Sequence, residues 1–485
     1  MKLLTIGIDG GDQRIIRAMP MPNLHQLLDQ NICLDIEEDL WGRGWAKILC
    51  GMPGHESGAF YAKPRLDGTH GTTQAFSVRD YDKNSDIKPL WRRLSDADHK
   101  VGFMNVPSMM PAPDVNGFAV SGGGAGAATS GKATIPKEAC QPEKIGQFLS
   151  ETGYMLDLRI VSSGIKDIAL FFEELLSMTR LRTDAFIELQ NRFSVQYGFI
   201  AYMSVCRIQY LAMSEIESLI ENGNSPSNLF QEKLLHFYAE IDAQMGRLLS
   251  EVIPEQIMLV SDHGQSPRRY SVNVNDWLKT IGQQTTPAKS LNLLKKTAKT
   301  VSGFLPKGFK QGISRTAPSL KAKLGEGVHA DWEKTTAFGI RYVPGIYLND
   351  KERFGGPVET PEDKEALIRE IIDRFNKDKL AEEHNLLARE YRQTYSHAKY
   401  ETLLPEIWID HPDTYFFEQQ GSFITPNREY GPIQRLDKVK RDMLTGIKGR
   451  HPLLCVSSGL ADLVSHEDMR DLTLAYKLIL RGMGI

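Results

Sequence analysis

Two acidic residues and a histidine stand where buried strands are expected to end. Asp9 closes the apolar run LLTIGID, and Asp262 and His263 follow the run QIMLVS. In open α/β sheets, ligands bind beyond the carboxyl ends of the strands, where loops and helix N-termini converge. A carboxylate oxygen and an imidazole nitrogen together suit Zn, Mn or Fe. The pattern therefore predicts a site for a divalent cation, although an Asp at a strand end is also a common cap or turn residue.

The elements that position these residues are expected to alternate between strands and helices. Short apolar runs of the fully buried type predict strands, and helical stretches lie between most of them. The predicted strands cover residues 3–9, 100–107, 197–205, 256–262, 345–349 and 452–459. This alternation is typical of an α/β fold with a mostly parallel central sheet covered by helices on both faces.

Two segments look inserted into this core. Residues 160–195 have apolar positions at helical spacing, which predicts a helical pair over one end of the sheet. Residues 282–324 contain eight lysines and one arginine but no acid. They are expected to form either a solvated, partly helical cap or a cationic lid that covers an anionic substrate or contacts an acidic surface such as lipid headgroups. We predict a single domain over 1–485, with cap insertions at 160–195 and 282–327.

Composition excludes some classes of protein. A net charge of −3 argues against nucleic-acid binding driven by bulk charge. Five cysteines without a CxxC pair indicate neither a disulfide framework nor a zinc ribbon. The N-terminus lacks the apolar region of a signal peptide, and no window approaches 18 uncharged apolar residues. The sequence therefore indicates a cytoplasmic protein.

Five motifs in one order resemble the alkaline phosphatase superfamily, and most of all its type I phosphodiesterase and nucleotide pyrophosphatase branch. The motifs are IGIDGGD (6–12), NVPSMMPAPDVNGFAVSG (105–122), LVSDHG (259–264), ADWEKTTAF with GIYLN (330–349) and GRHPLLCVSSG (449–459). The resemblance covers essentially residues 1–480. It implies an α/β core with a helical cap, and a site with two divalent metals and a Thr or Ser nucleophile between them.

The resemblance also implies roles for four residues. Asp9 matches the ligand after the first strand, Asp262 and His263 match an Asp-His pair, and His451 matches a late histidine ligand. Asp9, Asp262 and His263 would share one metal. His451 would belong to the other.

The sequence departs from the family at the nucleophile. The family's loop has the form Thr-x-Pro-x-x-x-x-x-x-Thr-Gly, and here Gly51 occupies the place of its final Gly. Counting back ten residues places Trp41 at the nucleophile and Arg43 at the Pro. Tryptophan cannot attack phosphorus.

The second metal position has also changed. The family's Asp, and the His four residues later, are replaced by Cys206 and Tyr210. Cys206 is a zinc ligand if it is a thiolate, but a lone buried cysteine is more often a small apolar packing residue. We therefore expect one divalent metal (Zn, Mn or Fe), and we doubt a second. Three protein ligands and an open position are typical of a catalytic site.

Other residues near the changed loop are candidates for the chemistry. Arg43 has the planar fork that binds a phosphate or sulfate oxygen. His55 and Glu56 stand in a glycine-flanked loop, where they act as acid and base or are ordinary surface residues. Asp12 is expected to cap a helix. The alternative is that it supports a metal ligand without binding the metal itself.

These observations predict a divergent, metal-dependent hydrolase that acts on an anionic small molecule, a phosphate ester or a phosphodiester. Two alternatives remain at this stage. One is a non-catalytic binding protein that keeps the fold and has lost the nucleophile. The other is an enzyme that uses the same anion pocket for transferase, lyase or isomerase chemistry.

Overall fold

The computed structural model describes residues 1–122, 135–160, 167–287, 330–433 and 443–485. These residues fold into two compact units. The first unit consists of Met1–Tyr61, Ala75–Arg269 and Asn427–Ile485, and the second of Ala62–Gln74 and Tyr270–Pro426. The single domain predicted over the whole chain stays a prediction, and each unit is described by itself.

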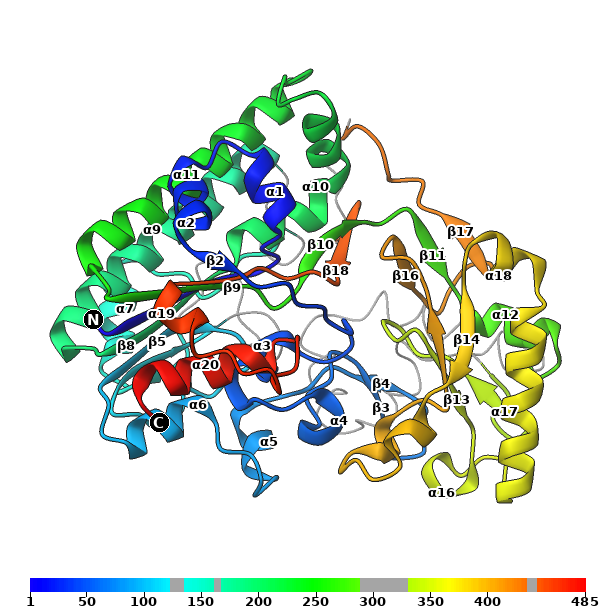
Figure 1. The fold of residues 1–485 in the computed structure, drawn as a ribbon. Coiled ribbons are helices and arrows are strands. Elements are labelled where there is room, and N and C mark those ends of the chain that lie inside the picture. The colour runs from blue at the N-terminus through cyan, green and yellow to red at the C-terminus, as the bar shows by residue number, and fades with distance from the viewer. Residues whose placement is uncertain (123–134, 161–166, 288–329, 434–442) are drawn as a thin grey trace, which may run out of the picture. The chain divides into compact units, whose positions relative to one another are not determined.

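The first unit holds the α/β core (Figure 1). Its strands are β1 (Leu3–Ile8), β2 (Ile32–Cys33), β5 (Val101–Val106), β6 (Gly117–Ser121), β7 (Cys140–Gln141), β8 (Tyr197–Tyr202), β9 (Gln256–Val260), β10 (Gly264–Pro267), β18 (Gly446–Gly449) and β19 (Leu454–Val456). Its helices are α1 (Gln13–Ala18), α2 (Pro22–Gln30), α3 (Gly44–Cys50), α4 (Gly54–Ser57), α5 (Val78–Asp82), α6 (Leu90–Asp96), α7 (Ile145–Glu151), α9 (Ile168–Phe193), α10 (Ser204–Glu221), α11 (Leu229–Val252), α19 (Ser458–Ala461) and α20 (Thr473–Met483).

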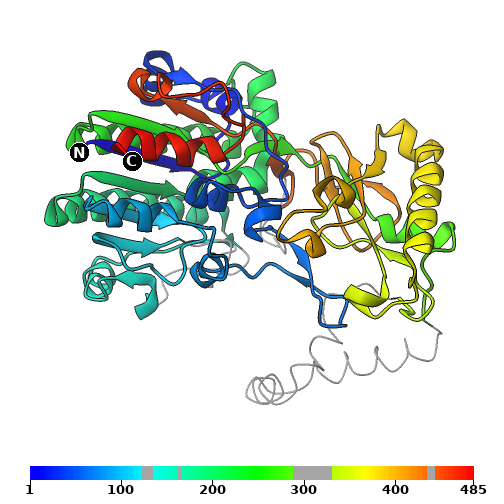
Figure 2. The same cartoon turned by 60° about the horizontal axis from the view of Figure 1, so that its bottom comes forward.

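The central sheet is mainly parallel, as predicted. Within the described residues it has eight strands in the order β2-β19-β9-β1-β8-β5-β6-β7. The five strands from β9 to β6 run parallel, whereas β2, β19 and β7 pair antiparallel at the two edges. Helices cover both faces (Figure 2). The α/β fold class predicted from the sequence is therefore confirmed.

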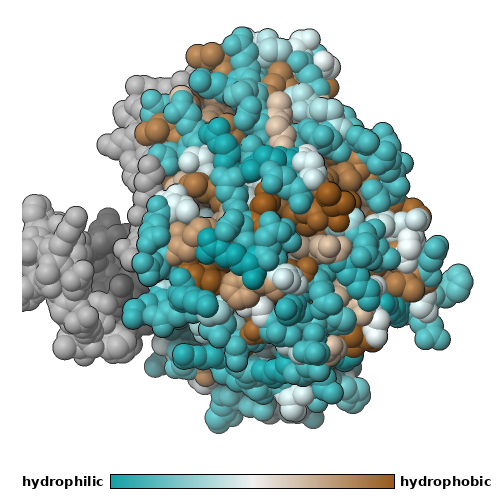
Figure 3. Space-filling model, turned by 90° about the vertical axis from the view of Figure 1, so that its left-hand side faces the viewer, coloured by the Kyte–Doolittle hydropathy of each residue, from teal (hydrophilic) through white to brown (hydrophobic). Residues whose placement is uncertain are grey.

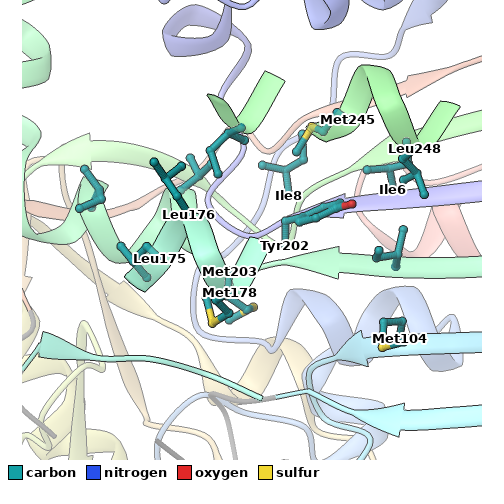
Figure 4. Packing of buried hydrophobic residues seen from close by; sticks show 14 of the residues in the cluster. Ile6, Ile8, Met104, Leu175, Leu176, Met178, Tyr202, Met203, Met245 and Leu248 are labelled. Carbon is teal, nitrogen blue, oxygen red and sulfur yellow. The ribbon is translucent and has the colours of Figure 1, made fainter. Parts of the chain in front are cut away.

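Alternate residues of the central strand β1 enter two hydrophobic clusters. Leu4, Ile6 and Ile8 pack with α9, α10 and α11 on one face, and Leu3 packs with α3, α6 and α20 on the other. Figure 4 shows Ile6 and Ile8 among methionines and leucines of the first cluster. Side chains of successive strand residues point to opposite faces, so a strand covered on both sides is apolar throughout. This is why the run at 3–8 predicts its strand well.

Of the segment 160–195, residues 161–166 lie outside the described residues, so the predicted helical pair stays a prediction. Helix α9 in this segment packs beside α11 and against β5, β6 and β8. Residues 167–193 contain no glycine or proline, and apolar side chains recur at helical spacing, so nothing in the segment ends the helix. Helix α9 contributes buried side chains to the core beside the sheet.

The second unit has small sheets and a separate hydrophobic cluster. Its strands are β3 (Lys63–Pro64), β4 (Thr72–Thr73), β11 (Tyr270–Val272), β12 (Ala337–Phe338), β13 (Gly345–Leu348), β14 (Leu387–Glu390), β15 (Ile407–Asp410), β16 (Tyr415–Phe417) and β17 (Ile424–Pro426). Its helices are α12 (Val274–Thr280), α16 (Lys351–Phe354), α17 (Pro361–Asn376) and α18 (Lys379–Glu383). The predicted strand at 345–349 is β13, which lies in the sheet β12-β13-β15-β14 and not in the central sheet. Of the basic segment 282–327, residues 288–327 lie outside the described residues.

No helix in the described part of the chain is long and apolar enough to cross a membrane. The face in Figure 3 is largely hydrophilic, with apolar residues scattered across it. Exposed apolar residues of this kind are usual in folded proteins.

Candidate functional site

The strand order brings four chain segments to one edge of the sheet. Strands β9, β1, β8 and β5 are consecutive neighbours and run parallel. Their carboxyl ends therefore lie side by side, and each is followed directly by residues of one pocket. These residues are Asp9 after β1, Pro107 and Ser108 after β5, Met203, Arg207 and Tyr210 after β8, and Asp262 and His263 after β9.

The three predicted ligands meet in this pocket. His263 Nε2 lies 3.8 Å from Asp9 Oδ1 and 3.4 Å from Asp262 Oδ2. All three side chains are buried. Ligand atoms that share one small cation at bond lengths of about 2.1 Å are about 3–4 Å apart. The sequence prediction that Asp9, Asp262 and His263 converge therefore agrees with the geometry.

The hydrogen bonds of His263 fix its tautomer. Nδ1 lies 2.7 Å from the carbonyl oxygen of Gly264, to which it must donate. Nε2 then carries the lone pair, and the hydroxyl of Tyr210 donates to it at 3.1 Å. Burial, and then the charge of Lys448, lower the pKa of His263 to about 3, so the ring is neutral. A neutral imidazole with its lone pair on Nε2 is the form that binds a metal, and a bound cation would take the place of the Tyr210 hydroxyl hydrogen.

Cys206 joins the same group. One ligand atom each from Asp9, Cys206 and His263 lie within 4.8 Å of one another, and all three residues are buried. Burial, and then the charge of Asp9, raise the pKa of the Cys206 thiol well above its usual range. The thiol is therefore neutral unless a bound cation removes its proton. The position of the Cys206 thiol beside Asp9 and His263 is compatible with its interpretation as a ligand.

The donor set fits a divalent cation. Burial raises the pKa of Asp262 to about 6, and burial together with Asp262 raises that of Asp9. Asp262 Oδ1 is buried and has no hydrogen-bond partner within the described residues. Buried carboxylate oxygens are rarely left without a partner, because the lost hydration is costly. A cation would satisfy this oxygen and relieve the repulsion between the two carboxylates.

Trp45, rather than Trp41, contacts the ligands. The indole Nε1 of Trp45 donates to Asp9 Oδ2 at 2.9 Å. Trp41 is buried and stacks on Phe60, with ring centroids 4.1 Å apart, and it does not line the pocket. The helix that carries Trp45, α3, begins at Gly44, where a Cβ would stand 2.0 Å from the carbonyl oxygen of Asp262. Only glycine permits this close approach.

Arg43 is the one of the three proposed catalytic residues that lines the pocket. It is buried, its Nε donates to the carbonyl oxygen of Phe60 at 2.9 Å, and burial lowers its pKa to about 10. His55 and Glu56 lie in α4, are half-buried and do not line the pocket. Burial lowers the pKa of His55.

The side chain of His451 is exposed, and it does not join the other three predicted ligands. Its carbonyl oxygen alone approaches the site, 2.5 Å from where a Cβ of Gly264 would stand. Asp12 caps α1 by accepting hydrogen bonds from the backbone of Arg14 and Ile15, which confirms the cap interpretation.

Sequence reasoning missed several pocket residues besides Trp45, and four of them bear on the chemistry. They are Ser108, Arg159, Arg207 and Lys448. The pocket has about 470 Å³ of space that no protein atom fills, open solvent at its mouth included. Arg207 and Ser108 each stand a few residues beyond a predicted strand, which is the signal that points to them. Nothing local distinguishes Lys448 or Arg159 from other charged residues.

A family profile and several solved structures match this chain. The profile of the type I phosphodiesterase / nucleotide pyrophosphatase family matches residues 66–422. A crystal structure of phosphonoacetate hydrolase from Sinorhizobium meliloti 1021 in complex with phosphonoformate has a similar fold, with a TM-score of 0.50 and 10% sequence identity over 99% of this chain and 96% of that chain. Murine ectonucleotide pyrophosphatase / phosphodiesterase 5, inactive and in complex with AMP, matches with a TM-score of 0.45 and 12% identity over 100% of this chain and 95% of that one. No curated protein matches the sequence.

Proposed function

Because this chain belongs to the type I phosphodiesterase / nucleotide pyrophosphatase family, a family of phosphoric ester hydrolases, we propose that it hydrolyses a phosphate ester or a phosphodiester with one divalent cation. The observation that carries the proposal is the convergence of Asp9, Asp262 and His263 on one point. They do so in a pocket lined by arginine and lysine. Phosphonoacetate hydrolase binds phosphonoformate, also an anion, which supports an anionic small-molecule substrate here.

Asp9, Asp262 and His263 are the proposed ligands, and Cys206 is a further one. Zn fits the thiol best, whereas Mn or Fe fits the two carboxylates and the imidazole alone. When bound, such a cation polarises a phosphoryl oxygen. A second cation is not part of the proposal, because Tyr210 hydrogen-bonds to His263 and the His451 side chain is exposed.

Neighbouring groups hold these ligands in place. The Trp45 indole fixes the orientation of Asp9, and the Gly264 carbonyl fixes the ring of His263. Arg43 is proposed to bind a phosphoryl oxygen through its guanidinium fork. His55 and Glu56 stay predictions as proton-transfer groups.

We propose that water attacks phosphorus without a phosphorylated side chain as intermediate. Trp41 stands at the nucleophile's place in the sequence, and its indole is buried against Phe60. As the bond from water oxygen to phosphorus forms, the ester P–O bond breaks; the proton that the water loses goes to solvent or to a pocket carboxylate, and the leaving oxygen takes a proton from solvent and departs as an alcohol. Acid-quenched protein from a reaction mixture should therefore contain no phosphorylated residue by mass spectrometry.

Two measurements test the proposal as a whole. Elemental analysis of purified protein should find about one equivalent of Zn, Mn or Fe. Aryl phosphate mono- and diesters, with added Mn or Zn, should be hydrolysed by the wild type and not by Asp262→Ala. The exposed Asp29→Ala is the matched control and should keep the wild-type rate.

Equal rates for the wild type and Asp262→Ala would remove the hydrolase proposal. A bound cation without turnover of any ester would also overturn it, in favour of a non-catalytic binding protein on the same fold. A cytoplasmic location remains our proposal, and it is supported by five cysteines that are all free. Contact of the basic segment 282–324 with an acidic surface also stays a prediction.

A further inference from the structure

More cationic than acidic side chains gather at the pocket, even when Asp157, which pairs with Arg207 behind it, is counted. Among the described residues that line it, the cationic side chains are those of Arg43, Arg159, Arg207 and Lys448, and the acidic ones are those of Asp9 and Asp262. Closely spaced cations in a partly buried pocket repel one another unless an anion lies between them. The excess of cations therefore favours an anionic occupant even before any metal binds.

Arg207 is held rigidly by a carboxylate behind the pocket. Its Nε and Nη2 donate to the two oxygens of Asp157 at 3.0 and 2.8 Å. Asp157 is buried and also lies 3.5 Å from Arg159 Nε. Nη1 of Arg207 forms no hydrogen bond within the described residues. Two hydrogen bonds already hold this guanidinium in one conformation. A ligand that binds the third nitrogen therefore costs little further side-chain entropy.

Lys448 contributes a second fixed cation from another part of the chain. It extends from β18, with its Nζ 3.9 Å from Asp262 Oδ2 and 4.3 Å from the ring centroid of Tyr61. The distance to Asp262 is too long for a hydrogen bond, so the ammonium keeps donors for a ligand. Its side chain is only 18% exposed.

The environment of Ser108 is an independent observation in favour of a ligand in the pocket. Its hydroxyl is buried and has no hydrogen-bond partner within the described residues. The residue also has a φ of 66°, in the left-handed region. Non-glycine residues adopt this conformation at a cost, and it is frequent at functional sites. A bound oxyanion would accept the hydrogen bond that the hydroxyl otherwise lacks.

We propose that Ser108, Arg207 and Lys448 together bind one tetrahedral oxyanion, the phosphoryl group of the substrate or free phosphate, and that they do so without a second metal ion. Cys206 and Tyr210 stand where the resemblance implies half of that second metal site. In the proposed site, the side chains of Arg207 and Lys448 supply the positive charge that the resemblance assigns to the second metal ion. This inference rests on the proposed function, because it concerns the same pocket. The binding of phosphate, however, is measured without measuring hydrolysis.

The test measures binding of inorganic phosphate by calorimetry to protein stripped with EDTA. Phosphate should bind the stripped wild type. Lys448→Gln should weaken binding about tenfold and Ser108→Ala about threefold, because a charge-assisted hydrogen bond contributes more than a neutral one. The matched control is Lys137→Gln, which removes an exposed lysine of the same unit and should leave the affinity within about twofold. Thermal melts confirm that each variant is folded.

The outcomes separate this inference from the proposed hydrolase. If the stripped protein binds phosphate and both variants weaken it, the oxyanion site stands even where no ester is hydrolysed. If phosphate binds only after metal is restored, or if Lys448→Gln and Ser108→Ala bind it as tightly as the wild type, the inference is overturned. If the inference is overturned in either way, the hydrolase proposal still stands, because it rests on the metal ligands alone.

Discussion

The indole Nε1 of Trp45 donates a hydrogen bond of 2.9 Å to Asp9 Oδ2, while Oδ1 of the same carboxylate faces His263 Nε2 at 3.8 Å. One oxygen of Asp9 is thus held by α3, and the other is turned toward the proposed cation. Groups that orient a ligand in this way commonly change metal affinity by 10–100-fold.

Trp45→Phe should therefore weaken divalent-cation binding about tenfold, because the ring is kept and only the donor is lost. Titration of EDTA-stripped protein with Mn or Zn measures the change. Trp91→Phe is the control, since Trp91 is buried in the same hydrophobic cluster and does not line the pocket. An unchanged affinity in Trp45→Phe would show that the hydrogen bond has no part in holding the ligand.

Asp157→Asn should be strongly destabilising. Asp157 and Arg207 are 1% and 7% exposed and form a bidentate pair, so the substitution leaves a buried guanidinium without its counter-charge. Loss of one partner of a buried ion pair costs about 3–5 kcal/mol. Urea unfolding followed by circular dichroism gives the value. Glu188→Gln, in an exposed pair with Arg192, should cost less than about 0.5 kcal/mol, and a similar small loss in Asp157→Asn would contradict the prediction.

Asp468→Asn should remove stability that depends on pH. Hydrogen bonds from Arg481 and Lys477 on α20 reach the Asp468 carboxylate, and the bond from Arg481 lowers the pKa of Asp468 well below its usual range. A lowered carboxyl pKa stabilises the fold above the unfolded value of about 4, and this stability is lost as the pH falls through the folded value.

At pH 7 we expect Asp468→Asn to lower the free energy of unfolding by about 1–2 kcal/mol. The difference from the wild type should shrink steadily as the pH falls below about 4. Urea unfolding between pH 3 and pH 7 measures it, with the exposed Asp462→Asn as control. A difference that is constant across this range would rule out the charge of Asp468 as its source.

Cys33 and Cys455 should form a disulfide under oxidation. They are directly opposite one another on the antiparallel strands β2 and β19, at the separation that a disulfide spans. A hydrogen bond from Cys455 lowers the pKa of the half-buried Cys33 thiol, which favours the thiolate, the form that reacts with an oxidant.

Diamide, which takes up the two electrons and two protons released, should link Cys33 to Cys455 in preference to the other cysteines. Mass spectrometry of non-reduced tryptic peptides identifies the linkage. Cys33→Ser should abolish it, and Cys140→Ser should not. Recovery of a different pair, or of five free thiols, would refute the prediction.

Much of the core was predictable because the signal is local. The runs at 3–9, 100–107, 197–205 and 256–262 are apolar on both faces, and burial on both faces of a parallel sheet requires that pattern. The acids that end two of these runs could therefore be placed at strand ends, and those ends at one edge. The strand at 345–349 has the same local pattern but lies in another sheet, because periodicity does not tell which strands pair.

The sequence by itself determined that Asp9, Asp262 and His263 follow buried strands, and it predicted Trp41 at the place of the family's hydroxyl nucleophile. The tertiary structure alone decided that Trp45 rather than Trp41 meets Asp9, that His451 is exposed, and that Ser108, Arg207 and Lys448 share the pocket. The physical reason is that Ser108 follows β5, Arg207 lies in α10 and Lys448 lies on β18. Only the order of strands in the folded sheet sets which of them become neighbours.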